Sequence, residues 1–325
     1  MPDRTLPSLS DSQIIQVDHL SVRIAPSITE LTQDAATLAQ DYLQSLLEQQ
    51  ETVSIILATG NSQLKFLDAI AEPGRSPIAS SNKLDWSRII LFHLDEYLGI
   101  SPEHPGSFRY YLRHKVEQRV KPRLFHYLEG DALQPIAECN RYGQLLQQQT
   151  IDLCLLGIGD NGHIAFNEPS VADFNDPHIV KLVQLEITTR QQQVNGGYFS
   201  DLEAVPSYAY TLTIPTICAA QKIFCLAGGS HKAEVVNKTL TQAISPSFPA
   251  TILRLIGSFG ACRCDGKIGQ TEVPRVQVPP QGALLPPSPR SPFGIACLVQ
   301  PRIRMRWSRL YRNSRKYEGH RAHRE

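Results

Sequence analysis

The 325-residue sequence lacks any apolar run of the roughly 18 residues that a membrane-spanning helix requires. Its first residues, MPDRT, also lack the basic stretch followed by an apolar stretch that marks a secretory signal. Neither membrane insertion nor secretion is indicated. We therefore expect a cytoplasmic protein without a membrane partner.

Cysteine spacing typical of a zinc site is also absent. The sequence has seven cysteines, of which only Cys262 and Cys264 are close together. Cys154 and Cys225 stand inside apolar runs, which is typical of reduced thiols that pack as small hydrophobic side chains. With 42% hydrophobic residues, the chain can bury a sizeable core without disulfides.

Net charge is nearly absent, at +1, yet the two parts of the chain differ sharply. Residues 1–254 contain 19 Lys and Arg against 27 Asp and Glu, whereas residues 255–325 contain 13 against 4. The later part is rich in proline and arginine and has little periodicity, which argues against a packed core segment. We divide the chain into an N-terminal segment (1–26), a domain (27–254) and a basic tail (255–325), which we expect to be disordered or aberrant. Because arginine-rich sequence without a fold motif is a poor predictor of nucleic-acid binding, we expect no nucleic-acid partner.

Within the domain, short apolar runs alternate with amphipathic stretches. Ser27 and Glu30 form a capping box at the start of the first amphipathic stretch. Helices are predicted at 27–50, 63–71, 107–120 and 136–149, and strands at 53–58, 89–94, 151–156, 179–185, 205–213 and 222–227. This alternation predicts an α/β fold: a three-layer α/β/α, Rossmann-like domain with a mostly parallel sheet.

The loop after strand 151–156 carries the densest set of polar groups. It reads GIGDNGHIAFNEP from Gly157 to Pro169 and contains Asn161, His163 and Glu168. In an open parallel sheet, ligands bind at the carboxyl ends of the strands. A histidine there can carry protons near neutral pH, and a neighbouring carboxylate or amide can orient its ring.

Three more strand ends carry candidate ligand groups. Thr59-Gly60-Asn61-Ser62 joins a strand to a helix N-terminus and can present backbone N–H groups to an anion. Asp95 follows strand 89–94, and Lys232 stands in a first helical turn, where the helix dipole does not favour a cation. A glycine turn and a solvated strand-end acid also occur for structural reasons alone, so the bare pattern leaves that alternative open.

The loop sequence GIGDNGHIAFNEP, considered together with the order of these segments along the chain, resembles the active-site loop of the glucosamine-6-phosphate deaminases. These enzymes are related to the 6-phosphogluconolactonases. Lactonase loops read Gly-His-Thr-Ala-Ser, whereas this chain has Gly162-His163-Ile164-Ala165-Phe166, which favours the deaminase branch. The resemblance covers about residues 27–254. It implies conversion of glucosamine 6-phosphate and water to fructose 6-phosphate and ammonia, without metal or organic cofactor.

The resemblance also implies site roles. His163 would open the sugar ring, with Glu168 as the carboxylate that orients it, and Asn161 stands where many relatives carry aspartate. Asp95 would move the proton between C2 and C1. The substrate phosphate would be held by Thr59, Gly60, Asn61, Ser62 and Lys232.

Two departures keep other interpretations open. Relatives carry a phosphate-binding arginine where this chain has Gly196-Gly197, and the final apolar strand of the family is replaced by the basic tail. The alternatives are a 6-phosphogluconolactonase and a catalytically inactive sugar-phosphate-binding protein. The sequence is compatible with a monomer or a homo-oligomer.

Overall fold

The computed structural model describes residues 13–71, 84–255 and 294–299. These residues form a large eight-stranded sheet with the order β1-β2-β11-β10-β7-β3-β4-β6. Strands β10, β7, β3, β4 and β6 are parallel to one another, whereas β1, β2 and β11 are paired antiparallel, which confirms the mostly parallel sheet. The strands are β1 (Gln13–Val17), β2 (Leu20–Ala25), β3 (Val53–Leu57), β4 (Ile89–His93), β6 (Leu124–Phe125), β7 (Leu153–Leu156), β10 (Ile223–Gly228) and β11 (Gly294–Val299).

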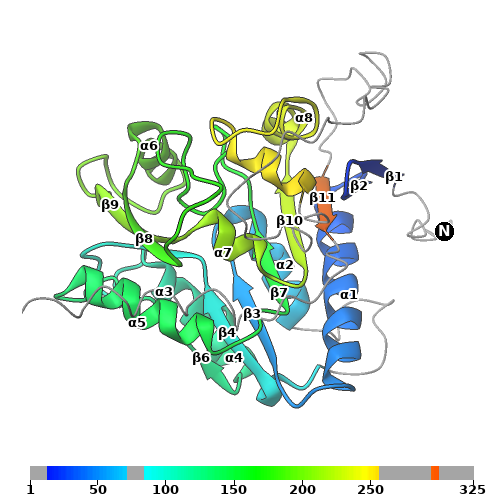
Figure 1. Ribbon diagram of the computed structural model, residues 1–325, viewed down its shortest axis with the longest axis horizontal. Coiled ribbons are helices and arrows are strands. Elements are labelled where there is room, and N and C mark those ends of the chain that lie inside the picture. The colour runs from blue at the N-terminus through cyan, green and yellow to red at the C-terminus, as the bar shows by residue number, and fades with distance from the viewer. Residues whose placement is uncertain (1–12, 72–83, 256–293, 300–325) are drawn as a thin grey trace, which may run out of the picture.

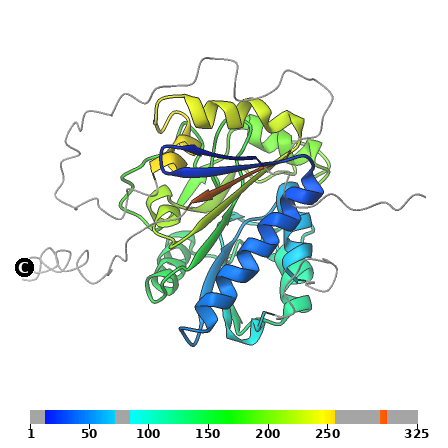
Figure 2. The same cartoon turned by 90° about the vertical axis from the view of Figure 1, so that its right-hand side faces the viewer.

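Helices cover both faces of this sheet, as the three-layer prediction requires (Figures 1 and 2). Alternate residues of a strand point to opposite faces, so Ile55 and Leu57 join one core cluster while Ile56 joins the other. The first cluster includes residues of α1 (Ile28–Leu47) and α2 (Asn61–Ala71), and the second includes residues of α5 (Pro135–Gln147), α7 (Ile214–Cys218) and α8 (Ala233–Thr241).

The start of α1 follows the capping-box prediction. The Ser27 side chain accepts a hydrogen bond from the backbone N–H of Glu30 at 3.2 Å, which satisfies a donor that the helix itself leaves open. The predicted helix 107–120 is divided, because a π-helical turn interrupts it. The segments are α3 (Phe108–Leu112), a π-helix (Arg113–Glu117) and α4 (Gln118–Val120); short 3-10 turns lie at Trp86–Arg88, Ser230–Lys232 and Pro249–Leu255.

A second, three-stranded antiparallel sheet lies beside the large one and was not predicted as a separate unit. Its order is β5-β9-β8, with β5 at Asp95–Tyr97, β9 at Tyr208–Leu212 and β8 at Val180–Gln184. Its core contains aromatic side chains, including Tyr97, Phe166 and Phe199. The chain passes from the large sheet to the small one between His93 and Asp95.

The structure corrects one part of the expectation for the basic tail. Residues Gly294–Val299, which read GIACLV, form β11 and pair with both β10 and β2. Averaged composition concealed this short apolar run, because proline and arginine dominate the residues around it. The rest of the tail, and residues 1–12 of the N-terminal segment, lie outside the described residues, and the domain limits at 27 and 254 stay predictions.

The prediction for the cysteines is confirmed where the structure describes them. Cys139, Cys154 and Cys218 are buried free thiols, and Cys225 is also buried. Burial raises the pKa of the Cys218 thiol to about 12, so it stays protonated and unreactive. In the described parts of the chain, no helix has the length and apolar character needed to cross a membrane.

Candidate active site

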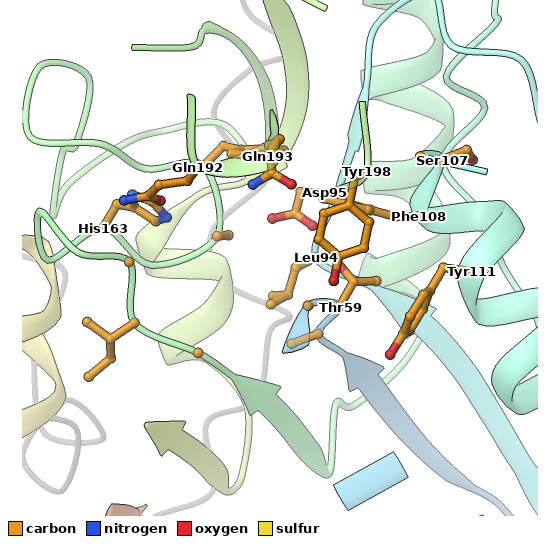
Figure 3. Close-up of a pocket in the computed structure, with 18 of the residues that line it drawn as sticks. Thr59, Leu94, Asp95, Ser107, Phe108, Tyr111, His163, Gln192, Gln193 and Tyr198 are labelled. Carbon is orange, nitrogen blue, oxygen red and sulfur yellow. The ribbon is translucent and has the colours of Figure 1, made fainter. Parts of the chain in front are cut away.

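One pocket lies at the carboxyl edge of the parallel strands. The adjacent strands β10, β7, β3 and β4 end at this edge, and each contributes residues from the loop that follows it. The pocket is lined by Thr59 and Gly60 after β3, Asp95 after β4, His163 after β7 and Lys232 after β10. Figure 3 shows Thr59, Asp95 and His163 around the pocket. The fold therefore assembles residues that are far apart in the sequence.

The loop after β7 is shaped by glycines. A side chain at Gly159 would overlap the His163 ring, so only glycine lets the imidazole lie against the backbone. Gly162 has φ +84°, and a Cβ there would meet the Phe248 ring at 2.7 Å. The backbone N–H of Gly159 donates to the His163 carbonyl at 2.9 Å, which closes the turn. These contacts hold His163 at the pocket wall.

Asn161 determines which nitrogen of the His163 ring carries the proton. The Asn161 side-chain oxygen accepts the backbone N–H of His163 at 3.1 Å, so this atom is an acceptor. The same oxygen lies 2.7 Å from His163 Nδ1, which must then be the protonated nitrogen. Nε2 is left as the basic nitrogen of the neutral ring.

The surroundings of His163 favour the neutral ring. Burial lowers the pKa of His163 to about 4, and the positive charge of Lys232 acts in the same direction. Asp160 and Glu186 oppose this shift. At neutral pH the imidazole is therefore uncharged and able to accept a proton at Nε2.

Asp95 is the first residue of β5 and pairs with Thr211 of β9. Only 7% of its surface is exposed. Burial, followed by the nearby charge of Glu96, raises the pKa of Asp95 well above its ordinary value. A carboxyl group with a displaced pKa at a pocket wall is typical of a functional site.

Glu168 does not hold the His163 ring, which corrects the expected pairing. Glu168 is fully buried, and its side chain accepts the backbone N–H of Glu186 at 2.9 Å. The isolated bridge between Ile164 and Asn167 reverses the chain between His163 and Glu168, so the two side chains contact different neighbours. The hydrogen-bond partner of the ring is Asn161, and Glu168 instead secures the start of α6 (Ile187–Asn195).

Lys232 lies in the pocket wall and is held in place from the loop after β7. Its Nζ donates to the Ile158 carbonyl at 2.8 Å and forms an ion pair with Asp160 at 2.6 Å. The other carboxylate oxygen of Asp160 accepts the Gln192 side-chain amide at 2.8 Å. Asp160 thus links a lysine from one loop to a glutamine of α6.

The turn after β3 is placed as the sequence predicts. Thr59 and Gly60 line the pocket, Gly60 has φ +105°, and α2 begins at Asn61. The side chains of Asn61 and Ser62 lie outside what the structure describes. The N-terminus of α2 therefore begins directly behind two pocket-lining residues.

The sequence analysis did not predict that α6 and the turn after it form part of the pocket wall. Gln192, Gln193 and Tyr198 line the pocket, and Figure 3 shows Gln193 and Tyr198 near Asp95. A run of glutamines followed by an aromatic pair is a weak signal, because α6 lacks the apolar spacing that would place it. Arg190 is not among the lining residues, and its guanidinium donates to the Leu202 and Val205 carbonyls, so it does not supply the phosphate-binding arginine that the family resemblance implies.

Within residues 13–71, 84–255 and 294–299, no group of three or more His, Cys, Asp or Glu side chains is arranged to hold a metal ion.

The fold and the pocket define a Rossmann-like α/β domain whose ligand site lies at the carboxyl ends of its parallel strands. Residues 26–258 match the family described as glucosamine-6-phosphate isomerases and 6-phosphogluconolactonase. The chain belongs to this family.

Named relatives refine the comparison. The chain is 34% identical over 227 residues to a glucosamine-6-phosphate deaminase of Exiguobacterium. The matched segment covers 70% of this chain and 84% of the relative. It is 33% identical over 239 residues to a Thermoanaerobacter enzyme of the same name, which covers 73% and 89% of the two chains.

Solved structures agree with the sequence relatives. A monomeric glucosamine-6-phosphate deaminase matches with a TM-score of 0.63 and 33% identity, over 70% of this chain and 90% of that one. A 6-phosphogluconolactonase from Thermotoga maritima matches with a TM-score of 0.53 and 20% identity, over 67% and 88%, which shows a shared fold.

Proposed function

We propose that this protein is a glucosamine-6-phosphate deaminase, which converts glucosamine 6-phosphate and water to fructose 6-phosphate and ammonia. The observation that carries the proposal is the placement of Asp95, a neutral His163 and Lys232 in the wall of one pocket. The names of the relatives at 33–34% identity support the same substrate.

His163 opens the sugar ring in this proposal. Ring opening moves a proton from the C1 hydroxyl to the ring oxygen. The basic Nε2 of His163 accepts the first proton and returns it to the ring oxygen, while Asn161 keeps Nδ1 protonated throughout. A group that starts neutral can do both steps without a net change in charge.

Asp95 transfers the second proton. Its carboxylate removes the proton from C2 of the open-chain sugar and delivers it to C1, which converts the amino aldehyde through an enolamine to an imine. Water then hydrolyses the imine and releases ammonia. The raised pKa of Asp95 is compatible with this role, because the protonated 2-amino group of the substrate brings an opposite charge that favours the carboxylate form.

The phosphate is bound by Lys232 and by the turn Thr59-Gly60-Asn61-Ser62 at the start of α2. Backbone N–H groups at a helix N-terminus and an ammonium group both favour a dianion. Binding energy from the phosphate, which takes no part in the bond changes, orients C1 and C2 against Asp95 and His163.

The test is a coupled assay on the full-length protein in which ammonia and fructose 6-phosphate are followed together. Equal rates of appearance are expected from glucosamine 6-phosphate, with little hydrolysis of 6-phosphogluconolactone. Faster hydrolysis of the lactone, or tight binding of the amino sugar without turnover by a folded protein, would overturn the proposal.

We also propose that the protein acts in the cytoplasm and that residues 27–254 carry the catalytic groups. Every lining residue named above falls within that range. Size-exclusion chromatography with light scattering tests whether the protein is monomeric, like the deaminase to which it is structurally similar.

A further inference from the structure

Glu186 lies one side chain beyond the His163–Asn161 pair. One oxygen of its carboxylate accepts the Asn161 side-chain amide at 3.3 Å, and the other accepts the Ser170 hydroxyl at 2.8 Å. The Glu186 backbone N–H donates to Glu168 at 2.9 Å, which fixes the residue from the other side. We propose that Glu186 is a positioning residue for His163 and acts through the side chain of Asn161.

The hydrogen-bonding capacity of each group carries this argument. An ionised carboxylate can only accept hydrogen bonds, so the Asn161 NH₂ must face Glu186. The Asn161 oxygen must then face His163, which allows only the tautomer with the proton on Nδ1. Glu186, together with the backbone N–H of His163, therefore holds the Asn161 orientation that selects the tautomer with a basic Nε2, although it does not touch the ring.

The charge of Glu186 adds a second effect. When the ring accepts a proton, the imidazolium gains a favourable interaction with a negative charge, which neutral Asn161 cannot supply. The charged groups that act on the ring are Lys232, Asp160 and Glu186, and both acids favour the protonated form. Asp160 is 2.6 Å from Lys232 and offsets that positive charge locally, whereas Glu186 has hydroxyl and amide partners.

A role limited to helix capping does not explain the contacts. Glu186 immediately precedes α6, yet its side chain accepts no backbone N–H of that helix; its contact with α6 is the Thr188 hydroxyl, which donates to one carboxylate oxygen at 3.5 Å. The carboxylate instead turns toward the loop after β7, where Asn161 and Ser170 meet it. A side chain that served only α6 would accept N–H groups from the first turn.

The role of Glu186 is tested by enzyme kinetics, which rest on the proposed function, and by a measurement of the His163 tautomer, which does not. Glu186→Gln keeps the size of the side chain while removing the charge and offering an NH₂ that competes with that of Asn161. We expect kcat to fall about tenfold with KM changed by less than about twofold, because the ring and not the substrate is affected.

The tautomer is measured directly by ¹⁵N chemical shifts of labelled histidine in the full-length protein, with His163→Asn used to assign the signal. The native protein is expected to show a single tautomer with Nδ1 protonated, and Glu186→Gln a mixture of tautomers. This readout needs no substrate, so a wrong tautomer result and a wrong substrate assignment are distinguishable.

Two further variants separate positioning from a structural effect. Ser170→Ala removes the hydrogen bond to the far oxygen of Glu186 but leaves its charge and its contact with Asn161, so kcat and the tautomer are expected to stay near native values. Asn161→Asp combined with Glu186→Gln returns a carboxylate to the ring, and we expect kcat to recover to within about threefold of the native value. Native kcat and tautomer in Glu186→Gln, or a lowered kcat with an unchanged tautomer and no recovery in the double variant, would overturn the proposal.

Discussion

Asp95 and Glu96 are neighbours in β5 and are both buried, yet they belong to different regions of the molecule. Asp95 belongs to the pocket wall, together with His163 and Lys232. Glu96 belongs to a support layer, in which buried polar side chains bind the backbone. It accepts hydrogen bonds from the Ser107 hydroxyl at 2.8 Å and from three backbone N–H groups, those of Tyr97, Phe108 and Arg109.

The difference follows from strand geometry and from what each carboxylate contacts. Successive residues of a strand point to opposite sides, so one carboxylate faces the pocket and the other faces the start of α3. Burial raises the pKa of both groups, but in Glu96 the hydrogen bonds oppose the effect of burial. A carboxylate that accepts several hydrogen bonds supports the structure, whereas one that faces a pocket is available for chemistry.

Asp95→Asn changes a side chain of the pocket wall and is expected to have the largest effect on activity. We expect kcat to fall by about 10² to 10⁴, because an amide cannot accept the C2 proton. Stability at neutral pH is expected to be unchanged or higher, since burial and the charge of Glu96 already favour the uncharged carboxyl group. Steady-state kinetics and urea denaturation measure the two effects. Native turnover in this variant would remove Asp95 from the mechanism.

Glu96→Gln is the matched change in the support layer. The amide NH₂ would face donors at the start of α3, leaving buried N–H groups without an acceptor. We expect the free energy of unfolding to fall by about 2 kcal/mol. Urea denaturation beside Asp95→Asn makes the comparison, and an equal loss of stability in the two variants would contradict the distinction between wall and support.

Lys232→Met tests the phosphate end of the pocket wall. We expect KM to rise about tenfold or more with a smaller change in kcat, because the lost charge acts on a group remote from the reacting carbons. Lys238→Met is the control, since Lys238 forms an exposed pair with Glu234 on α8 and does not line the pocket. Equal KM values for the two variants would argue against phosphate binding by Lys232.

The pH dependence of stability gives the smallest expected effect. His163 has a pKa of about 4 in the folded protein and 6.5 as its ordinary value, so the unfolded chain binds a proton that the folded protein does not. This contribution to stability is complete above pH 6.5 and is lost as the pH falls toward 4. Burial lowers the pKa of His93 to about 3, so its contribution to the stability of the folded protein is also lost as the pH falls.

His163→Asn should remove one of these two contributions. We expect the variant to lose about 1 kcal/mol less than the native protein between pH 7 and pH 5.5, as measured by urea denaturation at both values. Parallel losses in the native protein and the variant would show that His163 titrates alike in the folded and unfolded states.

Several parts of the site could be predicted because the chemistry and the topology are local. Short apolar runs indicate strands, and parallel strands end at one edge, so Thr59, Asp95, His163 and Lys232 were expected to converge there. The pairing of Glu168 with His163 was wrong because five residues of separation say little about contact once the chain reverses between Ile164 and Asn167. The pocket wall of α6 was missed because polar lining residues produce no hydrophobic period.

The amino-acid sequence by itself determined the alternation of strands and helices that builds most of the parallel part of the sheet, the Ser27 cap and the residue types that can bind phosphate and move protons. These properties depend on local hydrophobic pattern, on backbone donors near each residue and on intrinsic side-chain chemistry. Only the tertiary structure decided that Asn161 holds the ring, that Glu186 stands behind it and that GIACLV completes the sheet. The contacts of Glu186 and of GIACLV join segments distant in the chain, and their energies depend on burial and on partners that no single stretch of sequence contains.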